Sequence, residues 1–177
     1  YSELKPVWWY ARDGGLPSAP KQVQLILSDL CNQDCHFCAY RMSGGFSSEQ
    51  FADEKGNRNP NRRIPTAKAI EILDDCASLG VKAIQFTGGG EPTVHPDFLL
   101  IAEYAQNLGL ETSLVTNGIL FRDGWQFILP KMKWVRVSID SGSAEEYALV
   151  RRVKPEFYAT AIGHVARLAA EIRKQGT

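Results

Sequence analysis

Residues 81–92 read VKAIQFTGGGEP, an apolar run that ends in three glycines, a glutamate and a proline. The run predicts a buried strand from Val81 to Phe86, and the glycines predict a tight turn at its carboxyl end. On either side, apolar residues recur at helical spacing, over about 66–79 before the strand and about 97–108 after it. A strand that lies between two helices indicates an α/β fold.

The same alternation extends along the chain in both directions. Further strands are predicted at 23–29, 111–116 and 134–139, a short helix near 121–129, and helical segments at about 145–150 and 156–174. Strands that are joined through helices form a parallel sheet with right-handed crossovers. The four βα units predict a partial TIM-like (βα) barrel. A doubly wound sheet is the structural rival, because the strand order is not readable from the sequence.

The composition is that of an ordinary globular protein. Hydrophobic residues make up 44% and charged residues 23% of the 177, and 20 basic side chains balance 20 acidic ones. A general nucleic-acid binder would show a basic excess or stripe, so no nucleic-acid partner is expected. No run approaches the ~20 apolar residues of a membrane span, so no membrane partner is expected, and the first residues do not resemble a signal peptide.

The chain divides into an N-terminal extension, 1–22, and a core, 23–177. The extension lacks an initial Met, which suggests that the numbering starts inside a longer gene product, and its aromatic cluster Trp8-Trp9-Tyr10 is expected to pack over the barrel. The stretch from Arg41 to Arg63 is rich in Gly, Ser, Asn and Arg. It is expected to form an inserted loop and is a candidate lid.

The segment Cys31-Asn32-Gln33-Asp34-Cys35-His36-Phe37-Cys38 carries three of the four cysteines. Clustered cysteines differ from a spread disulfide framework and favour a reducing, cytoplasmic setting. Three thiolates on one loop can wrap a compact metal centre, and an iron–sulfur cluster that lacks its usual fourth ligand would keep one iron open for a small molecule.

Other interpretations of the cysteine segment remain open. A zinc site would need a fourth ligand, from His36 or Cys76. A redox pair of Cys35 and Cys38 would leave Cys31 unexplained. Cys76 lies on the apolar stripe of a predicted helix, which favours a core thiol.

The spacing CxxxCxxC just after a first strand, with the aromatic Phe37 before the last cysteine, resembles the signature of the radical S-adenosylmethionine (radical SAM) superfamily. The resemblance implies that Cys31, Cys35 and Cys38 hold a [4Fe–4S] cluster, that Phe37 contacts the cofactor, and that the amino and carboxylate groups of S-adenosylmethionine bind the fourth iron. It further implies reductive cleavage of S-adenosylmethionine to a 5′-deoxyadenosyl radical, which takes a hydrogen atom from an unidentified small-molecule or peptide substrate. The electron would come from a donor such as flavodoxin or ferredoxin.

The turn Gly88-Gly89-Gly90-Glu91 is similar to the GGE motif of this family. Glycines allow the backbone to approach a ligand closely. Backbone carbonyls and the Glu91 carboxylate could then accept hydrogen bonds from the cofactor ammonium. The alternative is a tight turn without a ligand, in which Glu91 only caps the following residues.

Two later strand ends extend the resemblance. Asn117 follows the third predicted strand, near the cofactor in the family, although Asn-Gly is also a common turn. Ser138 and Asp140, with Tyr147 and Arg151, resemble the S-x-D…Y…R stretch of the branch with peptide-modifying enzymes and the molybdenum-cofactor cyclase. The resemblance implies that Ser138 contacts the ribose and Arg151 the cofactor carboxylate. The alternatives are a surface cation for Arg151 and a helix N-cap for Asp140.

Two expectations complete the prediction. His95 and His164 have no ligand-like companions and are interpreted as structural. The family barrel has six βα units, so the core is expected to be incomplete at its C-terminus, with a further protein segment that completes it. The rival function is a non-catalytic zinc or iron–sulfur module that recruits a partner.

Overall fold

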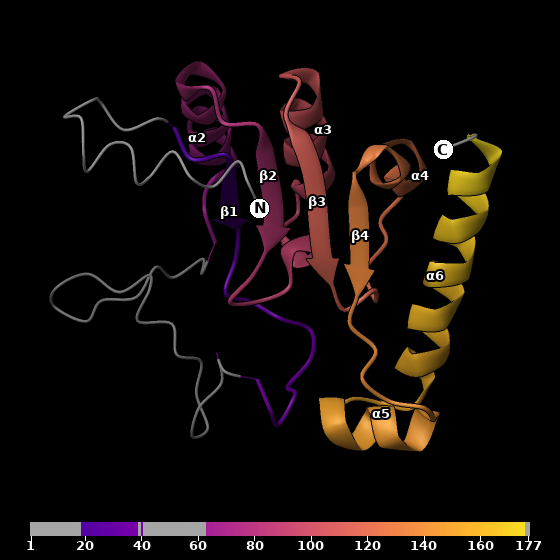
Figure 1. Ribbon diagram of the computed structural model, residues 1–177. Coiled ribbons are helices and arrows are strands. Elements are labelled where there is room, and N and C mark those ends of the chain that lie inside the picture. The colour runs from indigo at the N-terminus through magenta and orange to yellow at the C-terminus, as the bar shows by residue number, and fades with distance from the viewer. Residues whose placement is uncertain (1–18, 39, 41–62, 176–177) are drawn as a thin grey trace, which may run out of the picture.

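The computed structural model describes residues 19–38, 40 and 63–175 (Figure 1). The aromatic cluster Trp8-Trp9-Tyr10 and almost all of the candidate lid, 41–62, lie outside the described residues. None of the helices in the described part of the chain combines the length and the apolar character that a membrane span requires.

The centre of the fold is a sheet of four parallel strands in the order β1-β2-β3-β4. Their bounds are Gln22–Ile26 for β1, Ala83–Thr87 for β2, Glu111–Thr116 for β3 and Trp134–Val137 for β4. In a doubly wound sheet the strand order reverses at a switch point, whereas in a (βα) barrel each strand lies beside the next one in sequence. The sequential order therefore confirms the partial barrel and excludes the doubly wound alternative.

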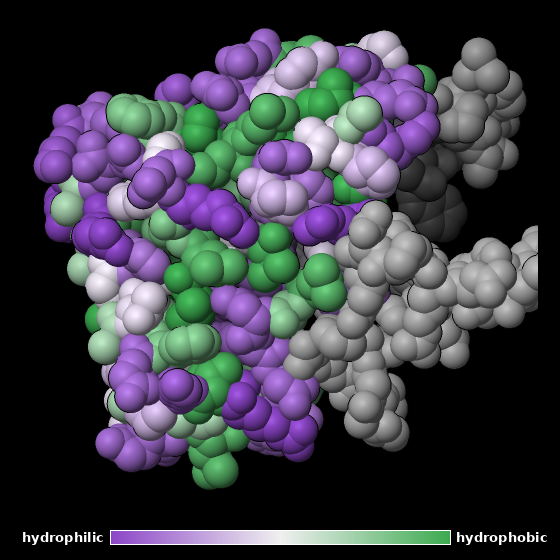
Figure 2. All heavy atoms as spheres, turned by 180° about the vertical axis from the view of Figure 1, so that it is seen from behind, coloured by the Kyte–Doolittle hydropathy of each residue, from purple (hydrophilic) through white to green (hydrophobic). Residues whose placement is uncertain are grey.

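Helices α2 (Thr66–Leu79), α3 (Phe98–Asn107) and α4 (Trp125–Ile128) lie along one side of the sheet, and α5 (Ala144–Arg151) lies beyond the carboxyl ends of the strands (Figure 1). Helix α2 contacts α3, and α3 contacts α4, so these three share a face (Figure 1). Figure 2 shows the molecule from behind, where hydrophilic residues lie interspersed with apolar ones, as is usual for a protein surface. The remaining helical bounds are Glu156–Lys174 for α6, with 3-10 turns at Pro92–Val94 (η3) and Leu129–Lys131 (η4).

The hydrophobic core lies between the sheet and these helices. Alternate strand residues such as Ile84, Phe86 and Leu114 are fully buried, as the two-residue period of a strand requires. Phe86 packs edge-on against Phe98 of α3, with ring centroids 5.5 Å apart. Cys76 belongs to this core and is 7% exposed, so its interpretation as a core thiol is confirmed.

The first and last strands end earlier than predicted. β1 stops at Ile26 instead of residue 29, and β4 stops at Val137 instead of residue 139. Beyond Ile26 the backbone carbonyls of Leu27 and Ser28 accept hydrogen bonds from Ile64 and Gly90 instead of from a strand ladder. In both strands the chain leaves the sheet at the carboxyl edge, which is where ligands bind in parallel α/β folds.

Candidate cofactor site

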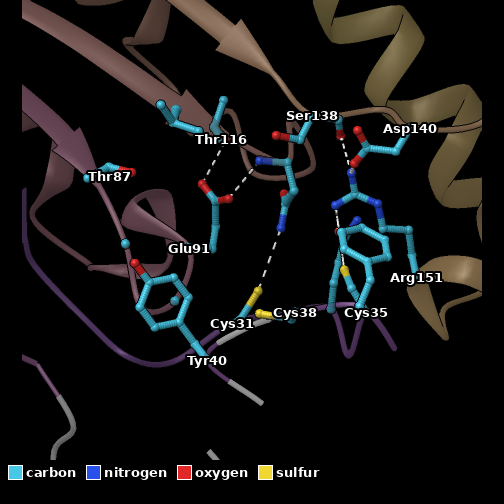
Figure 3. A pocket seen from close by; sticks show the side chains of 17 residues that line it. Cys31, Cys35, Cys38, Tyr40, Thr87, Glu91, Thr116, Ser138, Asp140 and Arg151 are labelled. Atoms are coloured by element: carbon cyan, nitrogen blue, oxygen red, sulfur yellow. Dashed lines mark hydrogen bonds and ion pairs between the residues drawn. The ribbon is translucent and has the colours of Figure 1, made fainter. Parts of the chain in front are cut away.

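A cavity of about 200 Å³, open to solvent, lies at the carboxyl ends of the four strands (Figure 3). Every residue that the sequence predicts for the cluster or the cofactor lines it, although these residues come from four separate regions of the chain. They are Cys31, Cys35, Phe37, Cys38, Gly88, Gly89, Gly90, Glu91, Asn117, Ser138 and Arg151.

The cysteine loop is held against the C-terminal end of α5. The backbone amides of Asp34 and His36 donate to the carbonyls of Arg151 and Val150, each at 3.1 Å. The last carbonyls of a helix have no partner within the helix, so the loop satisfies two of them. Cys31, Cys35 and Cys38 form no disulfide, and all three are partly exposed at the cavity.

The arrangement of the thiols favours a cluster over a zinc ion. In the described part of the chain, no three His, Cys, Asp or Glu side chains are close enough to share one metal ion. A zinc ion needs four ligands around one point, whereas the thiolates of an iron–sulfur cluster bond to separate irons. Of the fourth ligands considered for zinc, Cys76 is in the core, away from the cavity, and His36 does not line the cavity.

The glycine turn packs its backbone against the segment that leads to the cysteines. The amides of Gly90 and Glu91 donate to the carbonyls of Ser28 and Leu30, at 3.1 and 2.8 Å. A Cβ atom at Gly90 would lie 2.1 Å from the Leu30 carbonyl oxygen, and one at Gly88 would lie 2.0 Å from that of Gly90. Only glycine therefore fits at positions 88 and 90 without movement of the backbone.

Glu91 is 3% exposed and joins the ends of two strands. Its carboxylate accepts hydrogen bonds from Thr116 Oγ1 at 2.6 Å and Asn117 N at 2.7 Å (Figure 3). It also accepts from Thr93 Oγ1 at 2.7 Å and Thr93 N at 3.2 Å. Burial raises the pKa of the Glu91 carboxyl, and these hydrogen bonds oppose the rise. Glu91 thus caps η3, which is the alternative role weighed for it above, and its contact with a cofactor ammonium stays a prediction.

Asn117 connects the end of β3 to the cysteine loop. Its side-chain amide donates to Asn32 Oδ1 at 2.6 Å and lies 3.9 Å from Cys31 Sγ, while its Oδ1 accepts from the amide of Ile119 at 3.1 Å. The residue therefore forms a local turn and also contacts the proposed ligand loop.

Arg151 is 4% exposed, which excludes the surface-cation alternative. Its Nη1 donates to Gln33 Oε1 at 2.9 Å and to Cys35 Sγ at 3.5 Å. Its Nη2 donates to the Ser138 carbonyl at 2.8 Å and forms an ion pair with Asp140. The guanidinium thus joins the cysteine loop to the end of β4.

The prediction of Asp140 as a helix N-cap is wrong. Helix α5 begins three residues further on, after Ser143, whose Oγ accepts from the amide of Glu146 at 3.2 Å. Asp140 instead has a left-handed backbone, with φ of 55°, and pairs with Arg151. The N-cap is therefore Ser143, the residue directly before the helix.

Sequence reasoning missed the residue that supports Arg151. Gln33 donates from Nε2 to the hydroxyl of Tyr147 at 2.6 Å, and Tyr147 is fully buried. Burial raises the pKa of the Tyr147 hydroxyl, against the hydrogen bond from Gln33. The position of Gln33 between two motif cysteines was an available signal. Other lining residues that were not predicted as site residues are Tyr40, Thr87, Val115, Thr116 and Asp140.

Both remaining histidines contact the backbone, in agreement with their structural interpretation. His95 is buried, with Nε2 2.8 Å from the Ile64 carbonyl and Nδ1 accepting from the amide of Asp97 at 3.2 Å. His164 lies with Nδ1 2.7 Å from the Gly118 carbonyl and stacks on Phe121 at 4.6 Å between ring centroids.

Known proteins are similar to this chain in sequence or in fold. The AdoMet-dependent heme synthase of Methanosarcina barkeri is 31% identical over 153 residues, which cover 84% of this chain and 39% of the relative. The GTP 3′,8-cyclase of Staphylococcus aureus is 28% identical over 165 residues, or 87% of this chain and 46% of the relative. The chain therefore spans less than half the length of these curated relatives.

The fold is that of Streptococcus suis SuiB, solved bound to the precursor peptide SuiA. The two superpose with a TM-score of 0.67 at 21% identity, over 96% of this chain and 35% of that one. The sequence profile described as Radical SAM superfamily matches residues 25–173. The match covers the end of β1, the other three strands, the cysteine loop and the glycine turn, and the chain belongs to the radical SAM superfamily.

Proposed function

We propose that this chain holds a [4Fe–4S] cluster and S-adenosylmethionine and forms the core of a radical SAM enzyme. The observation that carries the proposal is the cavity shared by the three cysteine thiols, the Gly88–Glu91 turn, Asn117 and Arg151. When bound, the cluster and S-adenosylmethionine supply reductive cleavage to a 5′-deoxyadenosyl radical that abstracts hydrogen from the substrate. The protein contributes orientation and the exclusion of water.

In this proposal the cysteines bind the cluster and the glycine turn lies beside the cofactor. Cys31, Cys35 and Cys38 ligate three irons and leave the fourth without a protein ligand. The backbone of Gly88–Gly90 lies along the cavity where a cofactor can approach it, because glycine side chains take no space. Glu91 holds this turn in place through its hydrogen bonds to Thr93, Thr116 and Asn117.

Phe37, Ser138 and Arg151, across the cavity from the glycine turn, are proposed to make the remaining contacts with the cofactor. Phe37 is 52% exposed and lines the cavity together with the thiols, and Ser138 lies just after β4, where we place the ribose. Arg151 Nε is buried and meets no hydrogen-bond acceptor among the described residues. A cofactor carboxylate would satisfy this donor, in agreement with the role that the resemblance implies for Arg151.

The partners are proposed from the family and its relatives. We propose an electron donor such as flavodoxin or ferredoxin, and a substrate that is a small molecule or a peptide. The SuiB structure contains a precursor peptide, which supports the second class. We also propose a further protein segment that completes the barrel beside β4, the last strand of the sheet.

Anaerobic reconstitution tests the proposal. The chain is incubated with iron and sulfide, and bound iron, the visible spectrum and the electron paramagnetic resonance (EPR) of the reduced protein are measured before and after addition of S-adenosylmethionine. We expect a brown protein whose EPR signal changes on addition. A colourless protein that binds zinc instead, or a cluster whose signal ignores S-adenosylmethionine, would favour the non-catalytic module.

Single cysteine variants identify the ligands. We expect Cys31→Ala, Cys35→Ala and Cys38→Ala each to abolish stable cluster binding, because three thiolates already leave one iron without a protein ligand. Cys76→Ala is the matched control, since its thiol lies in the core away from the cavity. Equal loss of iron in Cys35→Ala and Cys76→Ala would contradict the ligand assignment.

A further inference from the structure

The Cys35 thiol receives a hydrogen bond from a charged donor. Arg151 Nη1 lies 3.5 Å from Cys35 Sγ. The guanidinium therefore favours negative charge on this sulfur.

The guanidinium is fixed in this position. Gln33 Oε1 and the Ser138 carbonyl each accept from it, at 2.9 and 2.8 Å, and the Tyr147 hydroxyl holds Gln33 from behind at 2.6 Å. The guanidinium carbon, Arg151 Cζ, lies 5.5 Å from the centroid of the Tyr147 ring. With 4% exposure, its charge is screened much less than that of a surface arginine.

We propose that Arg151 is a positioning residue that acts through Cys35 and raises the reduction potential of the cluster. The inference rests on the proposed function, because it requires the cluster to be held by the three cysteines. Reduction adds one negative charge to the cluster and its thiolates, and hydrogen bonds and charges around the sulfurs set the potential. A buried cation beside Cys35 stabilises the reduced form.

The negative charge of Asp140 partly offsets the positive charge of Arg151. Its carboxylate pairs with Arg151 Nη2 and is about half exposed, so it cancels part of the field at Cys35. Removal of the Arg151 charge should lower the potential, and removal of the Asp140 charge should raise it. A substitution that merely loosened the loop would give no such pair of opposite shifts.

The test is a redox titration of the reconstituted 177-residue chain, followed by EPR without S-adenosylmethionine, so that any carboxylate contact of Arg151 plays no part. For Arg151→Gln we expect the ratio of reduced to oxidised cluster at a fixed potential to fall about tenfold, a shift of about 59 mV for a one-electron couple. Asp140→Asn should shift the potential upward. Arg152→Gln is the control, because this neighbouring arginine is exposed and pairs with Asp34 at 3.5 Å.

Each outcome decides the matter. A lower potential in Arg151→Gln that Arg152→Gln does not share supports the proposal, and equal potentials in Arg151→Gln and the unchanged chain overturn it. If Arg151→Gln holds no cluster, Asp140→Asn decides: a raised potential supports the proposal and an unchanged one overturns it. An unchanged chain that assembles no cluster would overturn the proposed function itself, and this inference with it.

Discussion

Glu91 and Arg151 lie on opposite walls of the same cavity and are equally buried, at 3% and 4% exposure, yet their polar atoms differ in how they are satisfied. The Glu91 carboxylate accepts four hydrogen bonds, all from the protein. Arg151 donates through Nη1 and Nη2, but its Nε meets no acceptor in the described part of the chain. A buried donor without a partner costs about 1–3 kcal/mol.

This difference indicates that the side of the cavity with Glu91 supports the fold, whereas the side with Arg151 and the cysteines (the arginine wall) binds ligands. At Glu91 the hydrogen bonds link the ends of β2 and β3, so the turn is complete as folded. At Arg151 the protein keeps a buried donor without an acceptor among the described residues, and this costs some stability. We infer that the Glu91 wall acts mainly as a frame and that ligands gather at the cysteine and arginine wall.

The largest effect should come from removal of the Glu91 carboxylate. Glu91→Ala leaves the donors of Thr93, Thr116 and Asn117 buried and unpaired, so we expect the free energy of unfolding to fall by about 4 kcal/mol. Urea denaturation measures the loss. Glu111→Ala is the control, because Glu111 is exposed and forms a surface ion pair with Lys133 at 3.0 Å, and its loss should cost about 1 kcal/mol or less.

Glu91→Gln then separates support from ligand binding. A lower urea midpoint with an unchanged dissociation constant for S-adenosylmethionine is the result expected of a frame residue. An unchanged midpoint with at least about a tenfold weaker affinity would show that the carboxylate is directed at the cofactor instead, since a charge-assisted hydrogen bond contributes about 1.5–3 kcal/mol.

Gly90 tests the same wall through its backbone. Gly90→Ala would place Cβ 2.1 Å from the Leu30 carbonyl, which belongs to the backbone and cannot rotate away. We expect a loss of about 3 kcal/mol in thermal or urea unfolding. Gly163→Ala is the matched control, because no atom lies within 4 Å of its added Cβ within helix α6, and it should gain up to about 1 kcal/mol. A neutral Gly90→Ala would contradict the close packing of the turn.

Tyr147 tests how firmly the arginine wall is held. Tyr147→Phe keeps the buried ring but removes the hydroxyl that accepts from Gln33 at 2.6 Å, and we expect a loss of about 1.5 kcal/mol. Tyr158→Phe is the control, because its hydroxyl makes a longer, exposed bond of 3.3 Å to the Gly142 carbonyl. Equal unfolding midpoints for the two variants would mean that Gln33 and Arg151 need no support from Tyr147.

Local patterns predicted the elements well. The helices at 66–79 and 156–174 and the strand at 111–116 have the predicted bounds, because their periodicity and stop signals are local. The strand order was not predictable, since it depends on pairing between distant segments. The ends of β1 and β4 were misplaced for a similar reason: the backbone there bonds to residues far along the chain.

The site divides in the same way. The cysteine spacing and the glycine turn are local motifs that could be found in the sequence. The resemblance to the radical SAM superfamily assigned their residues to one site, and they line one cavity. The Gln33–Tyr147 hydrogen bond joins residues 114 apart, so no local pattern indicates it. Asp140 shows the limit of local capping rules, because the charge of Arg151, which the cap rule does not consider, attracts its side chain.

The smallest effect should come from the helix that carries Arg151. Ser143 Oγ accepts from the amide of Glu146 at the start of α5, and Ser143→Ala should lower the free energy of unfolding by about 1 kcal/mol. Hydrogen exchange gives the local test: the Glu146 amide should lose protection in Ser143→Ala and keep it in Asp140→Asn, because Asp140 pairs with Arg151 and caps nothing. If Asp140→Asn exposed the Glu146 amide equally, Asp140 would share the capping role, and the arginine wall would depend on the helix start as much as on the ion pair.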